Sequence, residues 1–457
     1  MKRIKTDLNR REFLASLGAM ALAGCVHGSQ GSSPDTKPNI LLIFIDDLGH
    51  ADLGCYGLKD AQTPNIDSLA RDGVRFTDGY VTASVCSPSR AGILTGRYQH
   101  RFGHEFNINH APRFRDMDMG LPTSEVTIAD SLKEAGYVTG AIGKWHLGHR
   151  EKYHPMNRGF DEYFGYLTGA HGHFNWNEEY WGPIYRDREP VEGNEYLQDA
   201  FSRESVDFIR RHKDEPFFLY LSCIAVHGPM QATKEDLDRH PDISNKMRKA
   251  LAAMLSSLDD GVGEILETLR ETGQDKDTLI FCISDNGGQP SHNASLNTPF
   301  RAGKGSMYEG GNRIPYIMKW PGQVPGSMVY EHPVSTLDVF PTALAAAGGR
   351  MPNDREMDGV DLMPYLAGRK EGTPHELLFW RRGDEYAVRK GDWKLVRPRK
   401  APLGLYNLSA DIKEENDLIE KRPEKVRELA NEYTRWCDKM TNPLWNWNDG
   451  TDIGKSK

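Results

Sequence analysis

Asn39-Ile40-Leu41-Leu42-Ile43-Phe44-Ile45 is an apolar run without alternation, and Asp46 and Asp47 follow it directly. Such a run is typical of a strand buried on both faces of a parallel sheet. Three later segments share this character and predict further buried strands, at 138–142, 217–226 and 278–283. Helical patterns lie between them, at 124–135 and 246–269. Because strands alternate with helices, the sequence predicts an α/β fold with a largely parallel central sheet flanked by helices.

The pattern changes near Gly372, where four short strand candidates are separated by turn residues, at 377–380, 385–389, 393–397 and 405–408. A helical pattern over 423–436 follows them. This order predicts a small C-terminal antiparallel-sheet subdomain with one helix. We therefore expect a main domain over residues 38–371 and a subdomain over residues 372–457.

The N-terminal residues have the character of an export signal. Basic residues and a twin-arginine segment, Asn9-Arg10-Arg11-Glu12-Phe13-Leu14, precede an apolar stretch that is too short to span a membrane. Leu22-Ala23-Gly24-Cys25 resembles a bacterial lipobox. We predict a signal peptide over 1–24, a lipid on Cys25, a tether over 25–37, and a periplasmic or outer-membrane-anchored lipoprotein outside the bacterial cytoplasm. The alternative is a signal peptide cut elsewhere, with Cys25 incidental.

Composition excludes several classes of protein. The 457 residues include 57 Lys+Arg and 65 Asp+Glu, a net charge of −8 that gives no electrostatic reason to expect nucleic-acid binding. No apolar run reaches the roughly 18–20 residues that span a bilayer, so we expect membrane contact only through the lipid anchor. Six cysteines in so long a chain are not a disulfide framework. Cys223 and Cys282 fall in apolar strands and are predicted to be buried free thiols.

Ionisable groups gather where the predicted strands end. The carboxyl ends of parallel strands share one edge of a sheet, where α/β proteins bind ligands. Asp46, Asp47, Asp285 and Asn286 offer only oxygen ligands, which suit a hard divalent cation, whereas a zinc site would normally recruit His or Cys. We predict one Ca²⁺ ion, with Mg²⁺ less favoured. The alternative for each acid pair is ordinary turn chemistry.

A second cluster surrounds Cys86, in Cys86-Ser87-Pro88-Ser89-Arg90-Ala91-Gly92-Ile93-Leu94-Thr95-Gly96-Arg97. Pro88 fits the first position of a helix with Ser87 as its cap, which would place Cys86 where free N–H groups favour an anion. Arg90, one turn later, can fold back and add positive charge. This spacing suggests a thiolate nucleophile of low pKa. The alternative is a small buried hydrophobe at a helix start.

These motifs resemble the type I, formylglycine-dependent sulfatases, which have an alkaline-phosphatase-like fold. The resemblance covers nearly the whole chain and includes, in family order, Asp46-Asp47, the Cys86 motif, Gly143-Lys144-Trp145-His146-Leu147-Gly148, His227-Gly228-Pro229, Asp285-Asn286-Gly287-Gly288, Lys304 and Glu309-Gly310-Gly311-Asn312-Arg313-Ile314-Pro315. The family also has a small C-terminal antiparallel sheet.

The resemblance implies a mechanism for these positions. A formylglycine-generating (sulfatase-maturating) enzyme would oxidise Cys86 to Cα-formylglycine (3-oxoalanine), whose hydrated diol is the nucleophile and, with a sulfate oxygen, completes the shell of a Ca²⁺ ion. Asp285 would help to take a proton, Arg90 would orient the diol, and Lys144 and Lys304 would balance the sulfuryl oxygens. His227 would protonate the leaving alcohol, and His146 would help to expel sulfate.

The predicted substrate is a sulfated carbohydrate, either a polysaccharide or its oligosaccharides. Some family members have a serine near Gly165–His171, and this chain has none there. Thr168, His171 and His173 are candidates to replace its contact, and His104 lies in a second loop of suitable composition. Seven basic residues also make the C-terminal subdomain locally basic, which could steer a polyanion: Arg381, Arg382, Lys390, Lys394, Arg397, Arg399 and Lys400.

Two other functions fit parts of the pattern. A phosphonate or phosphate ester hydrolase of the same superfamily would use a similar centre. A noncatalytic glycan-binding lipoprotein with this fold would keep Cys86 as an unmodified thiol.

Overall fold

The computed structural model describes residues 37–109 and 115–446, and every structural statement below concerns that part of the chain. The predicted signal peptide, the lipid site at Cys25 and the tether up to residue 36 lie outside it. The residues described from Lys37 onward belong to one compact unit. Within the described ranges, no helix is both long enough and apolar enough to cross a membrane.

A mixed sheet of eleven strands forms the centre of this unit. Its middle is parallel: β1 (Asn39–Ile45) lies between β10 (Thr278–Ser284) and β9 (Phe217–Cys223), and β4 (Val138–Lys144) and β5 (Glu162–Tyr166) continue the sheet beyond β9. The predicted central sheet is therefore confirmed, and all four segments chosen from the sequence are among these five strands.

The remaining strands of the sheet lie at its two edges, where most neighbours are antiparallel. On the β10 side they are β11 (Tyr316–Lys319), β2 (Val74–Phe76) and β12 (Met328–Tyr330), and on the β5 side β7 (Gly182–Arg186), β6 (Asn177–Glu178) and β8 (Glu189–Val191). A separate pair consists of β3 (Gly79–Tyr80) and β13 (Val334–Ser335).

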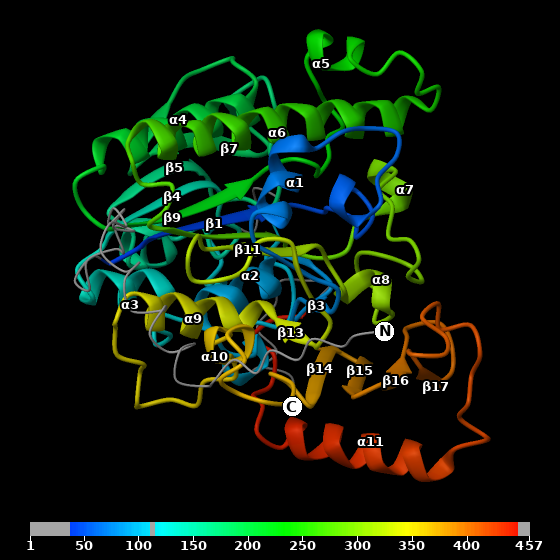
Figure 1. Cartoon of the computed structure of the whole chain (residues 1–457). Coiled ribbons are helices and arrows are strands. Elements are labelled where there is room, and N and C mark those ends of the chain that lie inside the picture. The colour runs from blue at the N-terminus through cyan, green and yellow to red at the C-terminus, as the bar shows by residue number, and fades with distance from the viewer. Residues whose placement is uncertain (1–36, 110–114, 447–457) are drawn as a thin grey trace, which may run out of the picture. The chain divides into compact units, whose positions relative to one another are not determined.

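Helices cover both faces of the sheet (Figure 1). On one face lie α1 (Pro64–Arg71), α4 (Leu197–Arg211), α5 (Lys234–Asp238) and α6 (Lys246–Glu271), and on the other α2 (Cys86–Thr95), α3 (Ile128–Glu134), α9 (Val339–Ala346) and α10 (Met363–Leu366). Short helical elements complete the chain: Gly54–Tyr56, Gln99–Phe102, Glu151–Tyr153, Pro155–Asn157, α7 (Pro290–Asn293), α8 (Glu309–Asn312) and Thr336–Asp338.

The position of β1 between two layers of helices explains why its sequence is apolar without alternation. Ile40, Leu42 and Phe44 pack into the core shared with α2, α3 and α9, whereas Leu41 and Ile43 pack into the core shared with α1, α4 and α6. All of these side chains are fully buried. Because each face of β1 has its own helical cover, neither set of alternating side chains reaches solvent.

The C-terminal subdomain is an antiparallel sheet of four strands, as predicted, with one helix against it (Figure 1). The strands are β14 (Leu377–Arg382), β15 (Glu385–Lys390), β16 (Trp393–Arg397) and β17 (Gly404–Asn407), and the helix is α11 (Pro423–Cys437). Tyr98 and Leu337 of the main domain share a hydrophobic core with this sheet. The fully buried Lys394 also contacts Glu309 of α8 at 2.7 Å. The subdomain therefore packs as part of the compact unit, and the boundary at residue 372 stays a prediction.

Three predicted boundaries are wrong. Strand β9 ends at Cys223 and not at Val226, so the chain has already left the sheet before His227. Helix α3 begins at Ile128 and not at Ser124, because Thr127 and Asp130 form a capping box there. Helix α2 begins at Cys86 and not at Pro88.

The prediction for the two strand cysteines is confirmed. Cys223 and Cys282 are both buried and both free of disulfide bonds. Their positions inside β9 and β10, facing the helices of one layer, account for their burial.

Candidate active site

The candidate site lies where β1, β4 and β10 end and α2 begins. Strand β1 leads into Asp46 and Asp47, and β10 leads into Asp285 and Asn286. The parallel register pairs Ile45 with Ser284, so the two acidic segments leave the sheet at the same level. Asp47 has a φ of 58°, a left-handed conformation that costs energy for a residue other than glycine. Strained backbone of this kind often accompanies function.

Asp46, Asp47, Cys86 and His227 each present a possible ligand atom, and these atoms all lie within 4.8 Å of one another. Asp285 joins the group by accepting a hydrogen bond from the backbone N–H of Asp47 (3.2 Å). These residues form a possible metal-binding cluster assembled from four separate segments of the chain. The sequence placed Asp46, Asp47 and Cys86 at a metal, but it assigned His227 only to acid catalysis.

The side chain of Asn286 brings a buried oxygen without a hydrogen-bond donor to the site. Its side-chain N–H donates to Asp47 Oδ1 at 2.7 Å and also to the carbonyl of Gly287. Its side-chain oxygen Oδ1 is buried and accepts no hydrogen bond from any described residue. A buried acceptor without a donor is costly, and a cation would satisfy it.

Three cationic side chains hold the carboxylates. Lys144 Nζ lies 2.6 Å from Asp46 Oδ2, and Lys304 Nζ lies 2.6 Å from Asp47 Oδ1. Arg90 Nη2 lies 2.7 Å from Asp285 Oδ2. Burial acts to raise the pKa of Asp46 and of Asp47, but the surrounding positive groups together, led by Lys144 at Asp46 and by Lys304 at Asp47, outweigh it, and both pKa values are lowered.

Asp285 behaves differently from the other two acids. Burial, together with the nearby charge of Asp46, raises its pKa in spite of its contact with Arg90. Of the three carboxylates, Asp285 is therefore the one whose surroundings favour holding a proton.

Helix α2 carries the nucleophile candidate at its first residue. Cys86 is 2% exposed, and its thiol donates to Asp46 Oδ1 at 3.6 Å. Arg90 lies one turn later on the same face, which is why it reaches Asp285 and, at 3.8 Å, Asp46. Its guanidinium also donates to the hydroxyls of Ser222 and Tyr220.

Two expectations about this helix are wrong. Ser87 does not cap it; its hydroxyl donates to the carbonyl of His146 (2.7 Å) and contacts His104 Nε2 (2.6 Å). Asn107, from a distant loop, instead accepts the N–H of Ser87 at 2.9 Å. The thiol is not of low pKa either, because burial raises the pKa of Cys86 to about 12 although Lys144 and Lys304 oppose this.

The two histidines predicted to move protons are held by carbonyl groups. The Nδ1–H of His227 donates to the carbonyl of Gly228 (2.7 Å), which leaves Nε2 facing Asp47 Oδ2 at 3.7 Å. The Nε2–H of His146 donates to the carbonyl of Ile108 (3.0 Å), so Nδ1 carries the lone pair of the neutral ring. His146 also has a positive φ of 55°.

The residues proposed to face the substrate are buried. His104, His171 and His173 have no exposed surface, and Thr168 is 2% exposed. His104 contacts Ser87, and His171 contacts the backbone of Gly172 and Gly182. These contacts support the loops from inside, and the predicted contact of these residues with substrate stays a prediction.

Several residues that shape the site are not among those predicted from the sequence. Ser222 and Tyr220 are polar groups within an otherwise apolar strand, and that interruption is the signal that could have identified them. Asn293, whose amide donates to the carbonyls of Asp47 (3.3 Å) and Val226 (3.2 Å), carries no such local signal. Asn107 has none either, because its partner is twenty residues away.

Comparison with protein families gives two matches. Residues 38–349 match the family model described as Sulfatase, and residues 302–440 match that of the N-sulphoglucosamine sulphohydrolase C-terminal region.

Curated relatives are similar over most of the chain. Human N-acetylgalactosamine-6-sulfatase is 38% identical over 378 residues, which cover 78% of this chain and 70% of the relative. The uncharacterised sulfatase YdeN of Escherichia coli K12 is 30% identical over 500 residues, which cover 89% of this chain and 87% of the relative.

Solved structures agree with these matches. The crystal structure of Ps i-CgsB is 38% identical, superposes with a TM-score of 0.86, and covers 90% of this chain and 95% of that chain. The same protein has been solved in complex with k-i-k-neocarrahexaose. The phosphonate monoester hydrolase of Agrobacterium radiobacter shares the fold, at 19% identity and a TM-score of 0.63, with 88% of this chain and 95% of that chain covered.

Proposed function

The chain belongs to the type I sulfatase family of the alkaline-phosphatase superfamily, and from that premise we propose that it removes sulfate from a sulfated polysaccharide or oligosaccharide using formylglycine and calcium. As a sulfuric ester hydrolase it acts on sulfate esters of glycans. The noncatalytic glycan-binding alternative is therefore set aside. The observation that carries the proposal is the convergence of Asp46, Asp47, Cys86 and His227 within 4.8 Å.

Apart from Cys86 and His227, to which the proposal gives other roles, the donors at the site are oxygen atoms and fit a hard cation. The carboxylates of Asp46, Asp47 and Asp285 and the unpartnered oxygen of Asn286 would hold one Ca²⁺, with position 86 beside it. Oxygen donors of this kind are those that calcium prefers. The bound ion would supply positive charge against the oxygens of the sulfate ester.

Position 86 fits a modified residue better than a free thiol. Burial raises the pKa of an unmodified Cys86 thiol, which disfavours the thiolate that a cysteine nucleophile needs. The aldehyde that would stand there supplies, when hydrated, the hydroxyl that attacks sulfur. A formylglycine-generating enzyme is the partner that this proposal requires.

Permanent charges at the site would bind the ester. Lys144 and Lys304 have ammonium groups at the carboxylate cluster, where they can also face sulfate oxygens. Arg90 is fully buried and fixed by Asp285, Ser222 and Tyr220, so it acts as an immobile positive charge behind position 86. Such charges stabilise a transition state without reorganising during the reaction.

The histidines can move protons in defined directions. His227 directs Nε2 toward the cluster, so a proton held there could pass to the leaving alcohol. His146 keeps its Nε2 proton on Ile108, so it would accept a proton at Nδ1. Asp285 is a second proton acceptor close to the cluster.

Export is the final part of the proposal. We propose that the protein is an exported bacterial lipoprotein, periplasmic or anchored to the outer membrane through Cys25. The twin-arginine and lipobox segments support this location. It also suits a glycan substrate that is met outside the cytoplasm.

Ester selectivity tests the proposed reaction. A phosphonate hydrolase shares the fold, so the two classes of ester must be compared directly. A sulfatase should hydrolyse 4-nitrophenyl sulfate and a sulfated galactan oligosaccharide with higher kcat/KM than 4-nitrophenyl phosphate or phenylphosphonate esters. Phosphate or phosphonate esters reacting faster than all sulfate esters would refute the proposal.

Replacement of His227 tests the role of the general acid. His227→Ala should reduce kcat by about 10²–10⁴-fold on a sugar sulfate, whose alcohol leaves poorly. The loss should be much smaller on 4-nitrophenyl sulfate, whose phenolate needs little protonation. His240→Ala is a matched control, since His240 contacts Ser256 and is not part of the cluster, and it should keep the wild-type kcat on both esters. Equal losses on both esters would show that His227 does not protonate the leaving group.

A further inference from the structure

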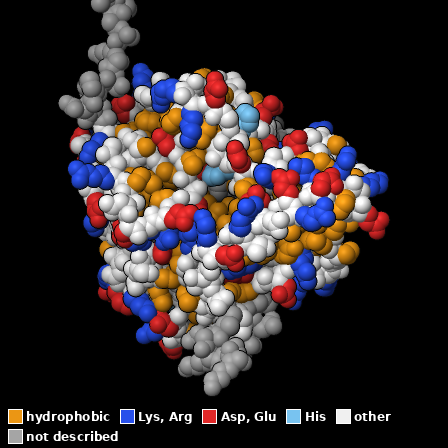
Figure 2. All heavy atoms as spheres, turned by 90° about the horizontal axis from the view of Figure 1, so that it is seen from below, with side chains coloured by type: hydrophobic (Ala, Val, Ile, Leu, Met, Phe, Trp, Pro, Cys, Tyr) orange, Lys and Arg blue, Asp and Glu red, His pale blue; other side chains and the backbone are white. Residues whose placement is uncertain are grey.

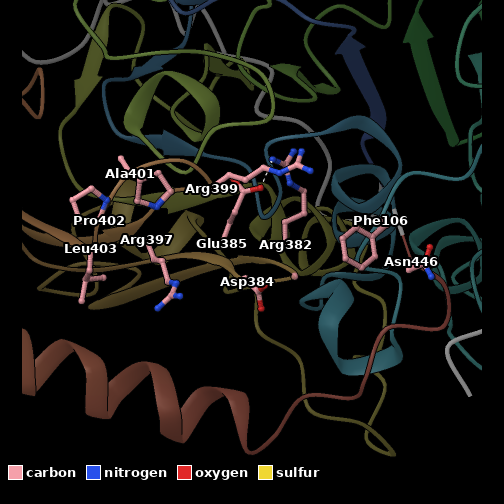
Figure 3. A pocket seen from close by; sticks show the side chains of 12 residues that line it. Phe106, Arg382, Asp384, Glu385, Arg397, Arg399, Ala401, Pro402, Leu403 and Asn446 are labelled. Carbon is pink, nitrogen blue, oxygen red and sulfur yellow. Dashed lines mark hydrogen bonds and ion pairs between the residues drawn. The ribbon is translucent and has the colours of Figure 1, made fainter. Parts of the chain in front are cut away.

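A pocket of about 620 Å³ lies between the C-terminal sheet and the loop that carries Phe106 (Figure 3). Its lining comes from three places: the β14–β15 turn, the chain at and after the end of β16, and Phe106 with Asn446. This volume falls in the range of roughly 300–1,000 Å³ that is usual for small-molecule sites. None of the residues already assigned to catalysis or to the metal lines it.

The pocket contains an excess of positive charge. Arg382 pairs with Glu385 at 2.8 Å. Arg399 is exposed and lines the same pocket, and it forms no ion pair with any described residue. Figure 3 shows the side chains of Arg382 and Arg399 directed to the same part of the pocket, whereas Arg397 and Asp384 point away from it.

Several other basic residues of the subdomain are paired. Arg381 pairs with Glu105, Lys390 with Glu428, and Lys394 with Glu309, so much of the basic character expected from the sequence is neutralised. Figure 2 likewise shows Lys and Arg intermingled with Asp and Glu over the face seen from below. A general basic surface that steers polyanions is therefore a poorer description than a local anion site.

Two short connections join the pocket to the catalytic centre. Arg382 donates to the carbonyl of Gly305 at 2.5 Å, and Gly305 directly follows Lys304. The N–H of Gly305 donates to the carbonyl of Ser84 (2.7 Å), two residues before Cys86. On the opposite wall, Asn107 is next to Phe106 and accepts the N–H of Ser87.

The walls of the pocket are fixed to each other. Glu105 is 2% exposed, and its carboxylate accepts two hydrogen bonds from Arg381, at 2.7 and 3.0 Å. It also accepts the N–H of Gly383 at 2.7 Å. The β14–β15 turn is thus tied to the loop of Phe106, which makes the pocket largely preformed.

We propose that this pocket is a second anion subsite, which binds a sulfate or carboxylate group on a sugar unit neighbouring the one whose ester is cleaved. The inference rests on the proposed function. The guanidinium fork of arginine matches the oxygens of such groups. Phe106 at one end of the pocket, and Pro402 and Leu403 at the other, add apolar surface against which a sugar ring can pack. The enzyme would then prefer glycans that carry anionic groups on successive units.

Turnover of matched substrates tests the subsite. The variant is Arg399→Ala, and the control is Arg427→Ala, an exposed arginine on α11 outside the pocket. Because the variant loses a charge-assisted hydrogen bond to the anionic group, kcat/KM on a multiply sulfated galactan hexasaccharide should fall about 10-fold, mainly through KM. On a singly sulfated oligosaccharide and on 4-nitrophenyl sulfate Arg399→Ala should match wild type.

Binding without turnover separates this inference from the proposed function. In a Cys86→Ala background, calorimetry should show about 10-fold weaker binding of the hexasaccharide when Arg399 is replaced by Ala, and unchanged binding with Arg427→Ala. Unchanged affinity and unchanged kcat/KM in Arg399→Ala would refute the subsite. Protein that binds the hexasaccharide through Arg399 but, with Cys86 present, releases no sulfate from any ester would refute the proposed function alone.

Discussion

Cys86→Ala is expected to abolish sulfate ester hydrolysis, with kcat falling by at least about 10⁴-fold on both 4-nitrophenyl sulfate and a sulfated oligosaccharide. The reason is that position 86 lies at the centre of the cluster, beside Asp46 and at the start of α2, where no other side chain can take its place. Steady-state kinetics with sensitive detection of released sulfate measures the loss.

A second cysteine provides the control for this variant. Cys55 is a free, partly buried thiol outside the cluster, so Cys55→Ala should keep most of the activity. Thermal unfolding of both variants should show that each is folded. Cys86→Ala that retains more than a few per cent of the wild-type kcat would contradict the assignment of the nucleophile.

Asp46→Asn is expected to remove both calcium binding and activity. Asp46 contacts Lys144 and Cys86 and lies within the possible ligand group, so its neutralisation removes a central negative donor. Wild-type protein should gain about 2.7 kcal/mol of stability at a calcium concentration 100 times the Kd, seen as a rise in Tm. The variant should show no such rise, and kcat should fall by about 10³-fold or more.

Chelation and a surface control complete this test. EDTA should inactivate the wild-type enzyme, and added Ca²⁺ should restore it. Asp238→Asn, an exposed acid paired only with Lys234, should keep both the calcium-dependent Tm and the activity. A wild-type Tm that does not respond to Ca²⁺ would contradict the proposed calcium site.

Much of the fold and part of the site could be predicted because they depend on local pattern. The run from Ile40 to Ile45 is apolar on both faces because both faces are covered by helices. Once β1 and β10 are recognised as parallel neighbours, Asp46 and Asp285 must leave the sheet at the same edge. The spacing of Cys86 and Arg90 predicts that both lie on one face of a helix, and in the structure both lie on α2 and contact Asp46.

The rest depends on contacts between distant segments. Nothing near Ser87 in the sequence indicates that Asn107 will cap its N–H, which leaves the serine hydroxyl for His146 and His104. The raised pKa of Cys86 follows from its burial, which the helix position alone does not reveal. The solvent exclusion of His104, His171 and His173 is likewise a result of loop packing.

The most direct test of the account is the mass of the peptide that contains position 86, taken from active enzyme produced in a host that has a formylglycine-generating enzyme. Conversion of the cysteine to the aldehyde should lower the peptide mass by about 18 Da, and the converted fraction should follow the specific activity of each preparation. Fully active enzyme whose peptide has the mass of an unmodified cysteine would contradict the central claim.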